Sequence, residues 1–376
     1  MLNVVCPRTS SQLAVDNLEA MLSTTRIVSR ASDHISPPAR SAVARFFDTP
    51  ELVLMLLEHL HQYRIDLLVV AAVCKQLRPL ALQAWMWHFD FDYKSFEGKL
   101  KLVQANSHLL AHIRCLRILS CNQWNEPGHH DSQRAPSLYW TKVESLFSLL
   151  SAHTSTYAQA PLLDIFINTA DGESLRRTLQ PYPGFLQRIA ALRLLDSVPR
   201  YNRGNNRQDR QDHNMFRTLG WTSLALLLDD VLYLKPTAVA LRVLEYQCSC
   251  HIAESQDPDR TAKKAFWCGV TTIAHRSLQE LHLSIDGTDP ATYVLQYGAF
   301  ASLKRFELLA IGDVENDRID SALIDTFLHR HTGLQQLSLS YIGSELARWD
   351  PVLDQAFPAL HTLEFGPGVW PSDEAT

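Results

Sequence analysis

The spacing of hydrophobic residues changes near residue 110 and divides the chain into two parts. Before that point, the stretch from Pro50 to Leu77 is hydrophobic almost throughout, with single charges between the apolar residues. After it, a six-residue pattern recurs in which the first, fourth and sixth positions are apolar. The first spacing is typical of short helices with more than one buried side, and the second of strands with one buried face.

Three short helices are predicted in the first part. Thr49 at the N-cap, Pro50 at the first helical position and Glu51 in the first turn are a favourable helix start. The hydroxyl can accept an unpaired backbone N–H, proline needs no donor there, and a carboxylate suits the helix dipole. A second helix is expected to begin near Asp66, and a third to end near Phe89. Helices spanning only about 45 residues bury too little surface among themselves, so their apolar sides predict a further partner surface.

The recurring pattern predicts an irregular α/β solenoid. Its middle apolar residues are separated by 49, 27, 52, 37, 25, 31 and 26 residues. Several of these spacings lie near the period of roughly 20–29 residues of leucine-rich repeats, and helix-like segments lie between the predicted strands. We interpret the longest gaps as degenerate repeats that carry inserted loops. The middle residues are Leu116, Ile165, Leu192, Leu244, Leu281, Phe306, Leu337 and Leu363.

Polar stretches separate and flank these segments. Residues 122–137, 201–214 and 254–264 lack the aliphatic residues needed for packing, so we expect surface loops there. Residues 1–40 are rich in Ser, Thr, Ala and Arg, which predicts a flexible leader. The predicted domains are a leader at 1–40, a helical domain at 41–94, a repeat domain at 95–370 and a tail at 371–376.

Composition agrees with a globular protein and argues against several other classes. The 376 residues are 46% hydrophobic and 20% charged, with a net charge of −5 and no basic stripe that would attract nucleic acid. The longest apolar run, Leu67 to Cys74, is eight residues, whereas a membrane-spanning helix needs roughly 20. We expect no signal peptide or membrane anchor. The seven scattered cysteines favour a reducing compartment, which means the cytosol or the nucleus.

The segment from Phe46 to about Phe89 resembles an F-box, in the style of fungal F-box proteins. The resemblance lies in TPELVLMLLEHL, IDLLVVAAVCKQL and WMW. The family pattern has a proline-led helix, a leucine-rich helix closing in Val-Cys-basic, and a terminal Trp. Thr49 stands where the family usually has Leu, and Leu77 where it usually has Trp. The matching residues are Pro50, Leu52, Leu57, Leu60, Leu67, Leu68, Val73, Cys74, Lys75 and Trp87.

The resemblance implies a substrate-receptor subunit of a Skp–cullin–F-box ubiquitin ligase. In that family the F-box docks on the Skp adaptor, which links it to the cullin core, and the C-terminal domain captures the protein to be ubiquitinated. Tethering of this kind raises the effective concentration of substrate lysines near the conjugating enzyme to the order of mM. We therefore expect protein partners, and neither nucleic acid, membrane nor cofactor. The expected adaptor-binding residues are the matching residues together with Leu56 and Leu77.

No constellation of residues in the sequence points to catalysis or to a metal. Cys74 precedes Lys75, but the apolar run LLVVAAV before it favours a buried, unreactive thiol. The stretch CSCH at 248–251 lacks the paired spacing of zinc ligands. Asp90 and Asp92 are accompanied by no glycine-rich phosphate loop, so we expect ordinary solvated carboxylates. We predict that the protein is not an enzyme.

The outward residues of the predicted strands form a candidate substrate-binding surface. Side chains alternate along a strand, so residues between the apolar positions line the concave face of a solenoid, where partners often bind. The alternative is an ordinary solvated face. We expect a more acidic C-terminal end, and weaker substrate binding after charge reversal at Glu245 and Glu307. The predicted residues are Arg117, Phe166, Arg193, Glu245, Glu280, His282, Glu307 and Glu364.

Two other functions stay open at this level. A leucine-rich scaffold outside ubiquitination would use its N-terminal helices only as a cap, packed against residues 95–120. An enzyme on an irregular α/β fold is the third hypothesis. Co-purification with the Skp adaptor separates the receptor from the scaffold. Leu57→Asp or Leu68→Asp is expected to abolish adaptor binding and to leave the C-terminal domain folded, because a buried unpaired charge is costly.

Overall fold

The computed structural model describes residues 42–59, 64–93, 95–120, 134–153, 160–196, 207–234, 241–248, 259–312, 319–343 and 357–366. The chain divides into two compact units, Met1–His88 and Phe89–Thr376, called unit 1 and unit 2 below. This division falls a few residues before the predicted boundary at residue 94. The predicted leader and tail lie outside the described residues.

Unit 1 contains four short helices in its described part. They are α2 (Ala42–Phe47), α3 (Pro50–His59), α4 (Arg64–Val73) and α5 (Arg78–Met86). Pro50 begins α3 and Glu51 lies in its first turn, as the sequence predicts. The predicted side-chain cap differs, however, because the Thr49 hydroxyl donates to the Arg45 carbonyl oxygen at 2.9 Å. That contact satisfies a carbonyl near the end of α2 instead of an N–H of α3.

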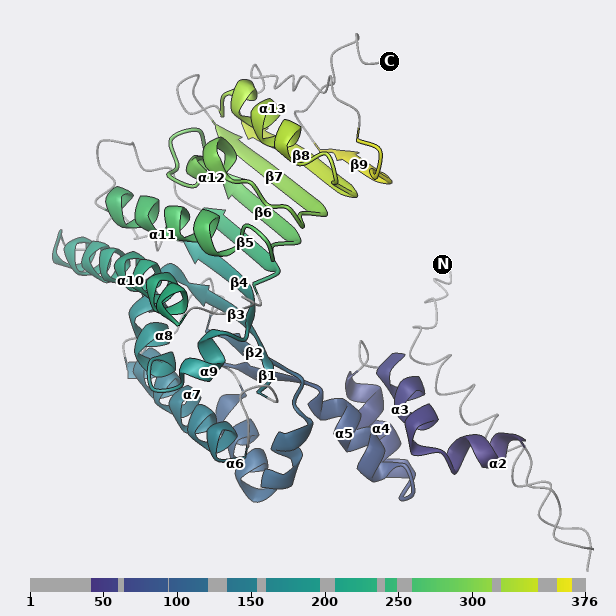
Figure 1. The fold of residues 1–376 in the computed structure, drawn as a ribbon. Coiled ribbons are helices and arrows are strands. Elements are labelled where there is room, and N and C mark those ends of the chain that lie inside the picture. Colours follow the sequence, from purple (N-terminus) through teal and green to yellow (C-terminus); the bar gives the residue numbers. More distant parts are fainter. Residues whose placement is uncertain are drawn as a thin grey trace, which may run out of the picture. The chain divides into compact units, whose positions relative to one another are not determined.

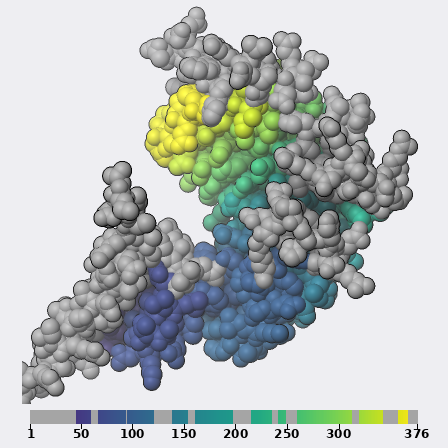
Figure 2. Space-filling model, turned by 180° about the vertical axis from the view of Figure 1, so that it is seen from behind, coloured from purple at the N-terminus to yellow at the C-terminus, as the bar shows by residue number. Residues whose placement is uncertain are grey.

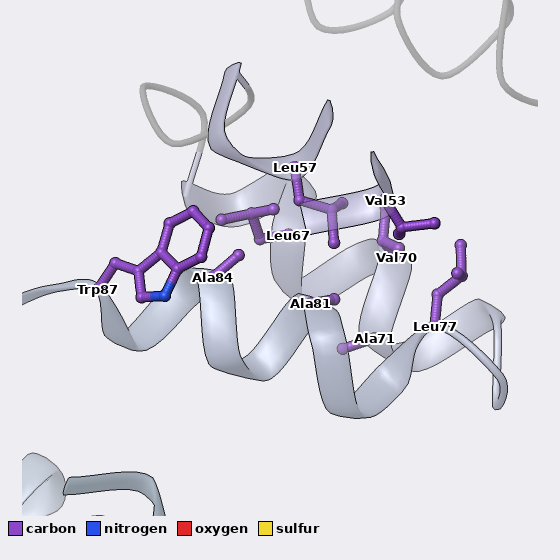
Figure 3. Close-up of a cluster of buried hydrophobic side chains, with 9 residues drawn as sticks. All are labelled: Val53, Leu57, Leu67, Val70, Ala71, Leu77, Ala81, Ala84 and Trp87. Atoms are coloured by element: carbon purple, nitrogen blue, oxygen red, sulfur yellow. The ribbon is translucent and has the colours of Figure 1, made fainter. Parts of the chain in front are cut away.

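The core of unit 1 is a single cluster between α3, α4 and α5, drawn in Figure 3. Side chains of α3 and α4 point toward small residues on α5, which lets the helices approach closely (Figure 3). Burial of a leucine or valine side chain is worth about 1.5–3 kcal/mol, so these few residues supply most of the stability of the unit. The cluster consists of Val53, Leu57, Leu67, Val70, Ala71, Leu77, Ala81, Ala84 and Trp87.

Unit 2 is built on a parallel sheet whose strands follow one another in sequence order, which confirms the predicted α/β class. In the described part of the chain this sheet has nine strands (Figure 1). The space-filling view shows the same progression from blue to yellow along unit 2 (Figure 2). The strands are β1 (His88–Asp92), β2 (Cys115–Leu119), β3 (Leu162–Asn168), β4 (Ile189–Asp196), β5 (Val243–Cys248), β6 (Glu280–Ile285), β7 (Arg305–Gly312), β8 (Gln336–Gly343) and β9 (Thr362–Phe365).

The first strand, β1, was not predicted. The sequence suggests that a helix ends near Phe89, whereas α5 ends at Met86 and β1 follows directly. Phe89 and Phe91 are fully buried while Asp90 and Asp92 are partly exposed. The stretch HFDFD therefore does alternate between apolar and polar residues, as a strand does. It is only five residues long, so the helical pattern before it dominated the prediction.

Helices connect the strands and lie along one face of the sheet (Figure 1). From β1 to β8 the side chains toward the helices are mostly buried, as in β5, where Leu244, Tyr246 and Cys248 alternate with less buried residues, whereas Leu363 on β9 is 46% exposed. The opposite face is called the helix-distal face below. The helical elements are α6 (Phe96–Ala105), η2 (Ser107–His112), α7 (Arg134–His153), η4 (Thr169–Asp171), α8 (Gly172–Leu179), α9 (Pro183–Leu186), α10 (Arg207–Tyr233), α11 (Arg260–Ile273), α12 (Thr292–Tyr297) and α13 (Ser321–Arg330).

The three predicted surface loops are only partly loops. Helices α7, α10 and α11 begin inside them, at Arg134, Arg207 and Arg260. The two longest gaps between strands therefore contain long helices of 20 and 27 residues. Helices can begin with polar residues, and such a start resembles a loop in sequence.

The strand register confirms the recurring pattern in seven of its eight positions and corrects one. From β3 to β9 the middle apolar residues lie opposite one another, beginning with Ile165 opposite Leu192. Leu116 on β2, however, lies opposite Leu163, and Arg117 lies opposite Asp164. The first repeat is thus displaced by two residues, which keeps its apolar side inward because the side-chain period is two.

Two glycines allow α8 and α10 to pack backbone against backbone. A Cβ atom on Gly220 would lie 2.0 Å from the Thr169 carbonyl oxygen, and one on Gly172 would lie 2.3 Å from the Gly220 carbonyl oxygen. No side chain fits at either distance. These residues set how closely α10 approaches the N-terminal part of the sheet.

Candidate functional site

Unit 1 exposes large hydrophobic side chains on α3 and α4. Met55 and Val73 are 60% and 70% exposed, and four other residues of these helices are about as exposed as surface leucines elsewhere in the chain. Scattered exposed apolar residues are normal, whereas a group on two consecutive short helices is a candidate interaction surface. We call this group the α3/α4 surface; it consists of Leu52, Met55, Leu56, Leu68, Val69 and Val73.

The predicted adaptor-binding residues fall into two structural classes. Pro50, Leu52, Leu56, Leu68, Val73 and Lys75 are exposed, and Cys74 is half-buried. Leu57, Leu67, Leu77 and Trp87 belong to the core of unit 1, and Leu60 lies outside the described residues. The exposed class can contact a partner directly. The buried class positions the helices, and its contact with a partner stays a prediction.

Arg78 fixes the angle at which α5 follows α4. Its Nε donates to the Ala71 carbonyl oxygen at 2.7 Å, and an Nη donates to the Ala72 carbonyl oxygen at 3.5 Å. These carbonyls lie in the last turn of α4 and have no intrahelical donor. The guanidinium therefore supports the part of α4 that carries Val73.

The helix-distal face of the sheet carries all eight predicted substrate-binding residues. Register places Arg117 and Glu280 in one cross-strand row, which also contains Asp164 and Arg305. The other six lie in the adjacent row, with Ser338 between the last two. In sequence order across the sheet they are Phe166, Arg193, Glu245, His282, Glu307 and Glu364.

From β1 to β5, charged side chains on the helix-distal face form ion pairs with oppositely charged side chains on the neighbouring strands. Arg117 Nε donates to Asp164 Oδ2 at 2.9 Å, and an Nη of Arg117 lies 4.0 Å from Asp90. Arg193 Nε donates to Asp164 Oδ1 at 3.2 Å, and its Nη1 donates to Glu245 Oε2 at 2.6 Å. Burial would lower the pKa of Arg193, but the two carboxylates raise it. The result is a ladder of alternating charges across five strands.

From β6 to β9 the described carboxylates on this face outnumber the cations. His282 lies between two of them, with Nδ1 2.8 Å from Glu307 and Nε2 3.5 Å from Glu280. Arg305 lies 3.4 Å from Glu307. Glu364 on β9 is exposed. The two halves of the face therefore differ, with balanced charge toward β1 and an acidic excess toward β9.

The structure also contains a buried group of charges that sequence reasoning missed. Asp196, at the end of β4, accepts two hydrogen bonds from Arg217 at 2.7 Å each and lies 3.0 Å from the Lys263 ammonium. Thr169 donates to the same carboxylate at 2.9 Å. Arg217 also lies 3.4 Å from Asp259. All four charged side chains are at most 3% exposed.

The charges in this cluster hold one another in their ionised forms. Burial alone would raise the pKa of Asp196, but Arg217 and Lys263 together hold it well below its usual value. Such a carboxylate contributes stability above its unfolded-state pKa, and this stability is lost as the pH falls into the acid range. The sequence did contain one signal of this cluster. Asp259, at the N-cap of α11, and Lys263, in its first turns, are four residues apart, a spacing that places both on one side of a helix.

The described residues contain no group of three His, Cys, Asp or Glu side chains that could hold a metal ion. Within the CSCH stretch, Cys248 is buried and the other three residues lie outside the described part of the chain. Cys268, on α11, is exposed. Asp92 accepts from Ser95 and Lys99 at the end of β1. None of the helices in the described ranges is both long and apolar enough to cross a membrane.

Comparison with known proteins identifies no relative. A scan against protein-family models, a search of curated proteins and a search of solved structures each found no match to this chain. Functional inference therefore rests on the residues and geometry described above.

Proposed function

We propose that this protein is the substrate-receptor subunit of a Skp–cullin–F-box ubiquitin ligase. Unit 1 docks on the Skp adaptor through the α3/α4 surface, and unit 2 presents a protein substrate on its helix-distal face. The protein itself makes and breaks no covalent bond. Its contribution is to hold substrate lysines close to the conjugating enzyme.

One observation carries this proposal: the segment that resembles an F-box keeps hydrophobic side chains exposed on two of its short helices. Leu52, Leu56, Leu68 and Val73 match the family pattern or adjoin it, and all four are exposed. A helical unit with a core of nine residues gains from covering such a surface with a partner. Resemblance and exposure thus indicate the same residues.

The helix-distal face supports the second half of the proposal. It is a broad, mostly polar surface on rigid strands, which is suitable for recognising a protein. The ladder from β1 to β5 is nearly balanced in charge, whereas the described carboxylates exceed the cations from β6 to β9. We therefore place the stronger substrate contacts on β6 to β9, at Glu280, Glu307 and Glu364.

Co-purification of the full chain with a Skp adaptor tests the proposal. The wild-type chain is expected to retain the adaptor through size-exclusion chromatography. Leu68→Asp introduces a charge into the proposed contact and should weaken capture at least tenfold, which corresponds to about 1.4 kcal/mol. Because Leu68 is 42% exposed in the free chain, the variant should keep the thermal unfolding temperature of the wild type.

Leu226→Asp is the matched control. Leu226 lies on α10 in unit 2 and is 41% exposed, so it receives the same charge at the same exposed fraction. It should retain the adaptor fully. Equal capture by Leu68→Asp and wild type would contradict the proposed surface. Failure of the wild-type chain to bind any Skp adaptor would favour the scaffold outside ubiquitination.

A further inference from the structure

Three buried side chains of unit 2 form a hydrogen-bonded chain across three strands. Tyr246 on β5 places its hydroxyl oxygen 2.9 Å from Asp289 Oδ2 and 3.4 Å from Asp196 Oδ2. Asp289 follows β6, and Asp196 ends β4. All three residues are at most 5% exposed. Bulk water is therefore excluded from these three side chains.

The hydrogens available to these three oxygen atoms limit the protonation states of the two carboxyl groups. The phenol carries one hydrogen, so with both carboxylates ionised the 2.9 Å and 3.4 Å contacts would have to share it. With both carboxylates ionised, one contact would bring two electron-rich oxygens together in a buried site, which is costly. A proton on one of the carboxyl groups supplies the second hydrogen.

The surroundings decide which carboxyl group holds that proton. Asp196 is bound by Arg217, Lys263 and Thr169, so it is the anion. Asp289 receives the Ala291 N–H at 2.7 Å and is closest to the Tyr246 hydroxyl. Among the described side chains of the cluster, Asp196 and Asp259 already balance the two cations.

The charged groups around Asp289 come from its own turn and from α11. Asp286, in the same turn, accepts from the N–H and the hydroxyl of Thr288 at 2.8 Å each. Arg260 of α11 donates to the Thr288 carbonyl oxygen at 3.3 Å. Lys263, one turn further along α11, lies against Asp196 and acts on Asp289 through space.

We propose that Asp289 is a neutral carboxylic acid in the folded protein at mildly acidic pH and that it acts as a proton-sensitive link between neighbouring repeats. In its protonated form it joins the turn after β6 to β5 and, through Tyr246, to β4. Loss of the proton leaves an extra negative charge beside Asp196 and weakens this link. The proposal is independent of the function proposed above.

The titration of Asp289 gives the direction of the effect. Burial raises its pKa from 3.8 to about 6, because it outweighs the lowering effects of Lys263, the Ala291 N–H and the Tyr246 hydrogen bond. The folded chain thus binds this proton more tightly than the unfolded chain. The stability it contributes is fully present below about pH 4 and is lost as the pH rises through about 6.

Denaturant unfolding of the full chain and of Asp289→Asn tests this link. The asparagine keeps the shape of the neutral acid and cannot ionise. Between about pH 4.5 and about pH 7.5, the unfolding equilibrium constant of the wild type should rise roughly ten- to thirtyfold relative to that of the variant. Asp320→Asn, at an exposed helix N-cap of α13, measures the background of the same substitution. A constant ratio between wild type and Asp289→Asn across this range would overturn the proposal.

Infrared spectroscopy supplies a second readout that does not require Asp289→Asn to fold. Burial also raises the pKa of the Asp171 carboxyl group, so the experiment uses Asp171→Asn as its background. At about pH 5 we expect the band of a buried protonated carboxyl group, separated in frequency from the solvated carboxyl groups that also carry protons there, and it should disappear toward about pH 7. Absence of such a band at about pH 5 would equally overturn the proposal.

Discussion

The two units differ in the kind of side chain that they bury. Unit 1 leaves leucine and valine side chains exposed on α3 and α4, whereas unit 2 buries Asp196, Arg217, Asp259 and Lys263 beneath its helices. A unit with a small core cannot cover all its apolar residues, while a large sheet has an interior deep enough to enclose charges. The difference lies in the buried charges, because unit 2 also exposes apolar side chains, among them Met215, Phe216 and Leu219 on α10.

Removal of Arg217 should have the largest effect. Arg217→Met leaves Asp196 and Asp259 without their guanidinium, and breaking a buried pair costs about 3–5 kcal/mol. Arg176→Met is the control, because Arg176 forms one partly exposed pair with Asp230 at 2.9 Å and should cost less than about 1 kcal/mol. Denaturant unfolding measures both. Similar losses in the two variants would contradict the view that unit 2 depends on its buried charges.

Alanine substitutions of two adjacent leucines on α3 should separate core residues from surface residues in unit 1. Leu57 is 3% exposed and Leu56 is 39% exposed. Leu57→Ala should destabilise unit 1 by about 2–5 kcal/mol, because it leaves a cavity in the core. Leu56→Ala should change stability little and weaken adaptor capture instead. If both variants unfold alike, the division into core and surface residues is wrong.

Gly220→Ala should separate α8 from α10. The new methyl group would meet the Thr169 carbonyl, a backbone atom that cannot move aside cheaply, so a loss of about 1–3 kcal/mol is expected. Gly98, within α6, has open space around its Cβ position. Gly98→Ala should therefore be neutral or stabilise by up to about 1 kcal/mol. Thermal unfolding of both variants distinguishes close packing from simple helix propensity.

Charge changes on the helix-distal face should affect stability least. Arg193→Gln removes contacts with Asp164 and Glu245, but Arg193 and Glu245 are partly exposed and the buried Asp164 keeps its bond to Arg117, so the cost should be about 1 kcal/mol. For an identified substrate, charge reversal at Glu307 and Glu364 should weaken binding more than reversal at Glu245. Binding titrations of the three variants test this order. A larger loss from Glu245 would place the contact on the ladder instead.

Local patterns predicted much of the fold. Alternation in segments such as LRVLEY and LQELHL is enough to place β5 and β6, because one side of each strand must face the core. Pro50 marked the start of α3 for a comparable local reason. The class of the protein and the face of each strand were therefore readable from the sequence. The same is true of the eight residues on the helix-distal face.

Tertiary structure decided what depends on neighbours distant in the chain. Whether Leu57 or Leu68 faces a partner depends on where α5 packs, and the sequence marks both simply as leucines. Because β2 is displaced in register, Arg117 lies opposite Asp164. The spacing of residues along a single strand does not reveal this pairing. Asp196, Arg217 and Lys263 read as solvated charges until parallel strands and helices bring them together. The sequence determined which residues are apolar and at what period, while only three-dimensional packing decided which charges are buried, because burial depends on contacts between distant segments.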